Sequence, residues 1–135
     1  MVIDSSALLA LLLGEPETEQ FVSAIAEAAE RLLSAASYLE TAIVIAGRFG
    51  PQGPEKLDRL VSELSIEIVP VNAEQAHLGI AGFQQFGRGT GHPAALNYGD
   101  CFTYALAKFT GQSVLFKGND FSRTDLTSAV AEPRA

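Results

Sequence analysis

The chain contains one cysteine and few basic side chains, and both scarcities limit what the protein can be. The single cysteine, Cys101, excludes a disulfide within the chain and favours a reducing compartment. The apolar run at residues 7–13 follows an acid rather than a basic region, and it is far shorter than the roughly 20 residues that cross a bilayer. We therefore expect a cytoplasmic protein with no secretory signal and no membrane association.

Nine Lys and Arg stand against sixteen Asp and Glu, which gives a formal net charge of −7. Because nonspecific nucleic-acid binding depends on neutralising phosphates, this balance alone argues against tight binding to nucleic acid. The objection weakens if bound metal cancels some carboxylates, and if the acids of residues 15–30 form a remote solvated face. An acidic chain also suits a basic protein partner. The basic residues that remain as possible phosphate contacts are Arg48, Arg88, Lys108, Lys117 and Arg123.

Strand and helix patterns alternate along the chain. Hydrophobic residues make up 47% of it, which argues against disorder, and 135 residues suit one domain. The patterns predict strands at residues 1–3, 31–35, 66–71 and 113–116, with a last edge strand at 126–130. They predict helices at residues 5–13, 17–30, 37–49, 55–64, 73–86 and 99–109. This order predicts a three-layer α/β sandwich in a single domain over residues 1–135, with a central, mainly parallel sheet of four to five strands flanked by helices.

Four acidic residues each lie at an expected transition from a strand to a helix or a loop. They are Asp4, Glu40, Asp100 and Asp120. In a parallel α/β fold such points gather at one edge of the sheet, where ligands bind. Crowded carboxylates repel one another, so their convergence is costly unless a cation lies between them. Because carboxylate oxygens suit Mg²⁺ or Mn²⁺, the leading hypothesis is metal-assisted phosphodiester chemistry.

Each acid also has an ordinary structural role open to it. Asp4 suits the N-cap of a helix, and Asp100 suits the first turn of one. Glu40 suits the third position of a capping box that Ser37 begins, and Asp120 suits a turn. Taken together these roles explain less, since Glu40 lies beside the expected apolar stripe of its helix and is free to project from the sheet edge. That stripe consists of Leu39, Ala42, Ile43 and Ala46.

The four acids belong to four ordered motifs. The motifs are Asp4-Ser5-Ser6-Ala7-Leu8, Ala36-Ser37-Tyr38-Leu39-Glu40, Leu96-Asn97-Tyr98-Gly99-Asp100-Cys101 and Leu115-Phe116-Lys117-Gly118-Asn119-Asp120-Phe121. In order and spacing they resemble the motifs of PIN-domain ribonucleases, and most closely those of the VapC toxins of bacterial toxin–antitoxin pairs. The resemblance spans the chain from Met1 to about Leu126. It implies a PIN-like fold and a metal-dependent endoribonuclease that hydrolyses RNA phosphodiester bonds.

The resemblance also implies roles and partners. The first and third acids, here Asp4 and Asp100, would hold the metal most directly. Glu40 and Asp120 would complete the pocket as ligands, through water, or by orienting the attacking water. The implied cofactor is Mg²⁺, with Mn²⁺ as the alternative, and the products would carry a 5′-phosphate and a 3′-hydroxyl. The implied partners are RNA, a VapB-like cognate antitoxin that blocks the pocket, and a second copy of the chain, joined through the apolar helices of the first half.

Three polar residues near the acids are candidates for orienting them. Hydroxyl or amide groups of Ser5, Asn97 and Thr103 would hydrogen-bond the ligating carboxylates, which fixes the orientation of metal ligands. Thr103 follows Asp100 by three residues and so shares its helix face. A simple helix start explains Ser5 equally well.

Two basic residues are candidates for substrate contact. Arg88 lies in the glycine-rich stretch at residues 87–99, the longest predicted loop, and long loops of compact domains are often functional. It would contact RNA phosphate there, although a solvated loop is an equal reading. Lys117 would stabilise developing charge or pair with Asp120.

Three other functions are alternatives to the nuclease. A haloacid-dehalogenase-like phosphatase needs an acid two residues after its nucleophilic Asp, where this chain has Ser6. A receiver domain needs a phosphoacceptor Asp in the middle of the chain, and residues 47–54 contain no acid. A catalytically silent PIN-type binding module would usually have lost a carboxylate, and here all four are present. The sequence therefore favours the nuclease.

Overall fold

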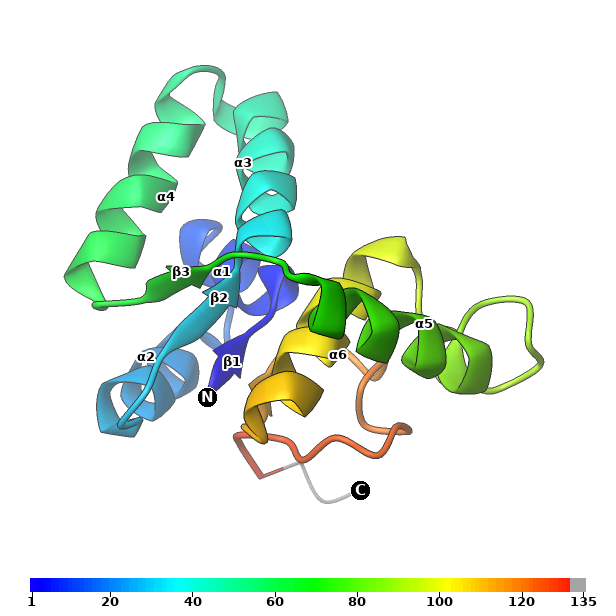
Figure 1. The fold of residues 1–135 in the computed structure, drawn as a ribbon. Helices are drawn as coiled ribbons and strands as arrows, with labels where there is room; N and C mark the ends of the chain where they lie inside the picture. Colours follow the sequence, from blue (N-terminus) through cyan, green and yellow to red (C-terminus); the bar gives the residue numbers. More distant parts are fainter. Residues whose placement is uncertain (132–135) are drawn as a thin grey trace.

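A small parallel sheet organises the protein, whose computed structural model describes residues 1–131 (Figure 1). The strand order is β3-β2-β1-β4, and all three pairings are parallel. The strands are β1 (Val2–Ile3), β2 (Leu32–Ser34), β3 (Glu67–Val69) and β4 (Val114–Leu115). The predicted α/β class with a parallel sheet of four strands is confirmed. The last four residues of the predicted single domain, 132–135, lie outside the described residues.

Six helices flank the sheet in the described part of the chain. They are α1 (Ser5–Leu12), α2 (Thr18–Glu27), α3 (Ala35–Phe49), α4 (Gln52–Glu63), α5 (Ala73–Phe86) and α6 (Tyr98–Thr110). Figure 1 shows α3 and α4 as a hairpin on one side and α5 lying along α6 on the other. None of the helices within residues 1–131 combines the length and the apolar character that crossing a membrane requires.

Both faces of the sheet are buried in apolar clusters. Side chains alternate along a strand, so Ile3 enters the cluster beneath α1, α2 and α4 while Val2 enters the cluster beneath α6. The same alternation separates Leu33 from Leu32 in β2. Because β1 and β4 are apolar and buried on both faces, polar groups beside them can appear only where these strands end. Asp4 directly follows β1 for this reason.

Three predicted local features are wrong, and two of them concern where an element begins or whether it forms. The helix α3 begins at Ala35, where Ser34 accepts a hydrogen bond from the Ala36 N–H at 3.3 Å, so the predicted capping box at Ser37 and Glu40 does not form. The strand β2 runs straight into its helix, which leaves no room for a later start. The predicted edge strand at residues 126–130 is reduced to an isolated bridge between Val114 and Ser128.

The third error concerns the face that α3 turns inward. The predicted stripe includes Leu39 and Ile43, yet these side chains are 59% and 64% exposed. The buried positions are Ser37, Thr41 and Ile45 instead. The inward face of α3 is thus largely polar: the Ser37 hydroxyl contacts Thr103 behind Asp4, and the Thr41 hydroxyl donates to the Ser37 carbonyl.

Candidate active site

The four predicted acids come together at the carboxyl edge of the sheet. Asp4 follows β1, Glu40 lies in the second turn of α3, Asp100 in the first turn of α6, and Asp120 in the turn after β4. Burial raises the pKa of the Asp100 carboxyl to about 7, although the hydrogen bond from the Asn97 N–H opposes the rise. The negative charges of Asp4, Asp120 and Glu40 raise it further. All three other acids therefore lie close enough to Asp100 for their charges to affect its ionisation.

Asp4 is held by two donors and is only 4% exposed. Its Oδ2 accepts the Ser6 N–H at 3.0 Å, which makes it the N-cap of α1 as well. Its Oδ1 accepts the hydroxyl of Thr103 at 2.6 Å, so the predicted contact of Thr103 with a carboxylate is present. That bond uses the only proton of the Thr103 hydroxyl, so Ser37 must donate in its 3.4 Å contact with Thr103. The buried hydroxyl groups of Ser37 and Thr103 thus form a chain of hydrogen bonds that fixes the orientation of Asp4.

Asp100 and Asn97 cap the helix α6 reciprocally. The Asp100 N–H donates to Asn97 Oδ1 at 2.9 Å, and the Asn97 N–H donates to Asp100 Oδ2 at 3.0 Å. Asn97 therefore orients the carboxylate through its main chain, and its side chain serves the helix end. The capping box expected at the start of α3 occurs here instead.

Glu40 reaches the site from α3 and contacts α1. The Ser5 hydroxyl donates to Glu40 Oε1 at 2.8 Å, as the sequence predicted for a carboxylate-orienting serine. Asp120 is exposed, unlike Asp4 and Asp100, and lies beyond the positive-φ residue Gly118. It is the acid with the freest access to solvent.

The expected ion pair of Lys117 with Asp120 is wrong. The Lys117 ammonium instead pairs with Glu15, and it lies 3.3 Å from Glu17 Oε2 without hydrogen-bond geometry. The loop between α1 and α2 brings these two acids to the end of β4, an arrangement that only tertiary structure sets. Lys117 is thereby neutralised away from the four acids.

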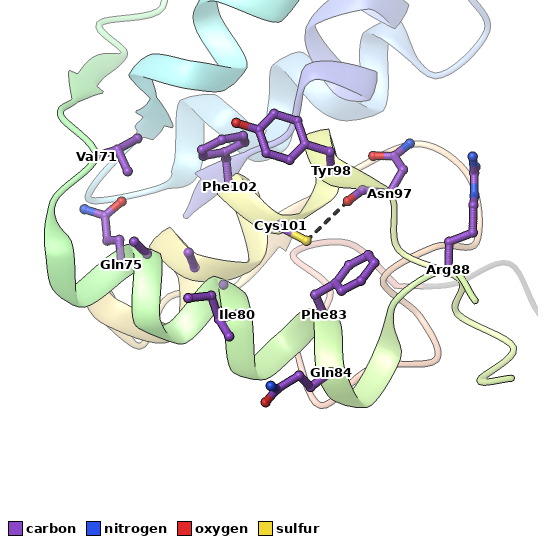
Figure 2. A pocket seen from close by; sticks show the side chains of 13 residues that line it. Val71, Gln75, Ile80, Phe83, Gln84, Arg88, Asn97, Tyr98, Cys101 and Phe102 are labelled. Carbon is purple, nitrogen blue, oxygen red and sulfur yellow. Dashed lines mark hydrogen bonds between the residues drawn. The ribbon is translucent and has the colours of Figure 1, made fainter. Parts of the chain in front are cut away.

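Arg88 lies outside the acid cluster. It is exposed and lines a groove of about 770 Å³ between α5 and α6, together with Asn97 and Tyr98 (Figure 2). The groove is mostly apolar, with Ile80 and Phe83 on its α5 side. Sequence reasoning missed it, because the same apolar residues fit a helix buried on both sides.

The donor set suits a hard divalent cation. All four groups offer carboxylate oxygens, two of them are buried, and within residues 1–131 no Lys or Arg forms an ion pair with any of them. Nowhere among the described residues, however, are three His, Cys, Asp or Glu side chains gathered at ligand distance. Asp4, Asp100 and Glu40 each accept hydrogen bonds from donors of their own. The residues fit a cation that would offset the repulsion among the four acids.

A family model and curated relatives point to the same protein family. Residues 1–126 match the family model described as the PIN domain. Ribonuclease VapC30 of Mycobacterium tuberculosis is 49% identical over 128 residues, which cover 95% of this chain and 97% of the relative. Ribonuclease VapC of Mycolicibacterium smegmatis is also 49% identical, over 95% of this chain and 98% of its own.

A solved structure supports the fold. The crystal structure of Mycobacterium tuberculosis VapC20, described as a Sarcin-Ricin loop cleaving toxin, superposes with a TM-score of 0.72. The match covers 93% of this chain and 95% of that one, at 17% sequence identity. At this identity the likeness concerns the fold alone.

The charge state of Asp100 yields a stability prediction for the metal-free protein. Its folded-state pKa of about 7 exceeds the ordinary 3.8, so the stability that its protonated form provides is complete below about pH 4 and is lost as the pH rises through 7. Asp100→Asn imitates the protonated form and keeps a hydrogen-bond acceptor for Asn97. We expect it to raise the free energy of unfolding by about 1–3 kcal/mol at pH 8 in chelator, and hardly at all at pH 4.

Urea unfolding at the two pH values measures this effect. An Asp58→Asn variant, which changes an exposed acid on α4, is the matched control and should show no such pH dependence. Equal stability of Asp100→Asn and the unmodified protein at pH 8 would contradict the account.

Proposed function

This chain belongs to the PIN-domain family and, within it, to the VapC ribonucleases, so we propose that it is a divalent-metal-dependent endoribonuclease toxin inhibited by a cognate antitoxin. The observation that carries the metal-dependent part is the convergence of four carboxylates around Asp100 without a cationic side chain to neutralise them in the described residues. Such a cluster is stable only when a proton or a cation joins it.

Asp4 and Asp100 would be the principal ligands of the cation, because they are the most buried of the four acids. Glu40 and Asp120 would complete the site. The cofactor proposed is Mg²⁺, with Mn²⁺ as an alternative, since both accept oxygen ligands. When bound, such an ion supplies Lewis acidity at the phosphate and makes water a better nucleophile.

The other polar groups of the site would fix these acids in place. Thr103 and the Ser6 N–H each hold one oxygen of Asp4, and the Asn97 N–H holds one of Asp100. Asp120 is exposed and so is the acid best placed to orient an attacking water. No nucleophilic side chain is required, and the Cys101 thiol, which donates to the Asn97 carbonyl at 3.3 Å, has no role in the proposal.

The proposed substrate is RNA. Arg88 is exposed at the groove that begins beside Asn97, so it is the basic residue we assign to phosphate contact. Lys117 is not assigned this role, because Glu15 and Glu17 neutralise it. With a net charge of −7, binding would depend on the metal and on a few local contacts rather than on a broad basic surface.

An exposed apolar surface supports the proposed homodimer. It joins the groove between α5 and α6 to a cavity of about 310 Å³ between α3 and α6, and both are lined by Tyr98 and Phe102. Contiguous exposed apolar surface marks interaction sites. Within the first half of the chain this surface lies on α3, since Leu8 of α1 is fully buried in the core. The exposed apolar side chains of α3, α5 and α6 that line the groove or the cavity are Leu39, Ile43, Val44, Ile80, Phe83 and Tyr98.

An antitoxin partner is part of the same proposal. The chain is acidic, which suits a basic partner through complementary charge. Glu40 borders the cavity between α3 and α6, so a partner seated there would lie beside the acids. We also keep the cytoplasm as the proposed location, where the lone cysteine would stay reduced.

RNA cleavage by the purified protein tests the proposal. We expect cleavage with Mg²⁺ or Mn²⁺ and none with chelator, and products that carry 5′-phosphates. Asp4→Asn and Asp100→Asn should each lower the cleavage rate by about a hundredfold or more, because each removes a ligand charge. Asp58→Asn, at an exposed position on α4, should cleave at the unmodified rate. Full activity of Asp100→Asn, or cleavage that survives metal removal, would refute the proposal and favour another mechanism.

A further inference from the structure

Gly99 occupies the first turn of α6 for no conformational reason. Its φ angle is not in the left-handed region, which is the usual explanation for a glycine. Glycine is also a poor helix former, so another residue would serve the helix itself better. The explanation must lie in the space that a side chain would fill.

The Glu40 carboxylate fills that space. A Cβ atom added at Gly99 would overlap Glu40 Oε2 and would lie 3.1 Å from both Cδ and Oε1 of the same side chain. All three of the nearest atoms thus belong to one carboxylate from α3. On its other side this carboxylate accepts the hydroxyl of Ser5, from α1, at 2.8 Å. Glu40 is therefore confined between the backbone of one helix and a hydrogen bond from another.

We propose that Gly99 is a positioning residue for the metal site: its missing side chain lets the Glu40 carboxylate lie against the first turn of α6, next to Asp100, where Ser5 holds it. The inference rests on the proposed function, in which Glu40 and Asp100 serve the same cation. A methyl group at Gly99 turns Glu40 aside and separates it from Ser5. Gly99 itself touches neither metal nor substrate and acts only through Glu40.

A glycine that is needed for close packing between helices would have backbone atoms, not a side chain, in the space of an added Cβ. At Gly53, a Cβ atom would lie 2.5 Å from the Ile45 carbonyl oxygen and 2.7 Å from its carbon, and backbone atoms cannot move aside. At Gly99 the atoms in the way are the far end of a flexible side chain. A Gly99→Ala protein therefore folds, and its defect is confined to Glu40.

The test is the Mn²⁺ dissociation constant of the full chain, measured by titration calorimetry, together with thermal unfolding in chelator. Gly99→Ala should weaken Mn²⁺ binding about tenfold, the usual effect of losing a group that orients a ligand. Its metal-free melting temperature should not fall. Gly47→Ala, a helical glycine of α3 with nothing within 4 Å of an added Cβ, is the matched control and should bind Mn²⁺ normally.

Two further variants show whether the effect passes through Glu40. Ser5→Ala should weaken Mn²⁺ binding without adding any atom to the site. In a Glu40→Ala background, Gly99→Ala should cause no additional loss, because the side chain it displaces is gone.

The outcomes separate this inference from the proposed function. If the unmodified chain binds Mn²⁺ and Gly99→Ala binds it equally well, only the role of Gly99 is overturned. The same holds if Gly99→Ala unfolds at a lower temperature, or if its effect persists without Glu40. If the unmodified chain binds no Mn²⁺, the metal site and this inference fail together.

Discussion

Repulsion among carboxylates is the constraint to which the rest of the structure responds. The strands β1, β2 and β4 are buried on both faces, and the parallel arrangement brings their carboxyl ends to one edge, where the acids gather. Neutral donors hold the acids there: the hydroxyls of Ser5 and Thr103 and the main-chain N–H of Asn97. None of these cancels a charge. Burial is the main cause of the raised pKa of Asp100, and the negative charges of the other three acids add to it, so a proton or a metal ion would stabilise the cluster.

The helix α3 shows how the site shapes the fold around it. Its buried face carries Ser37 and Thr41, and the Ser37 hydroxyl lies against Thr103, which in turn donates to Asp4. Because these hydroxyls occupy the inward face, Leu39 and Ile43 turn outward. The same orientation of α3 that places Ser37 behind Asp4 therefore also exposes the apolar side chains of the proposed partner surface. The candidate site and the exposed apolar surface both follow from one helix orientation, which explains why Glu40 borders both.

The parts of the fold that depend on local pattern were predictable. The helix α5 has the predicted bounds, and Asp4 and Asp120 come after the strands β1 and β4, as the pattern predicted. Features that depend on tertiary contacts were not. Periodicity assumes that the apolar face of a helix is the buried one, and α3 inverts that rule. The partner of Lys117 depends on where the loop after α1 folds. The pattern predicted Gly99 only as the first residue of a helix. Nothing in the sequence shows that the Glu40 carboxylate lies against it.

The most direct test of the account is anomalous diffraction from crystals of this protein soaked in Mn²⁺. The account predicts an anomalous peak in contact with carboxylate oxygens of both Asp4 and Asp100, with Glu40 and Asp120 beside it. A peak that touches only one of the two buried acids would contradict the account, and so would a soaked crystal in which this edge of the sheet binds no Mn²⁺.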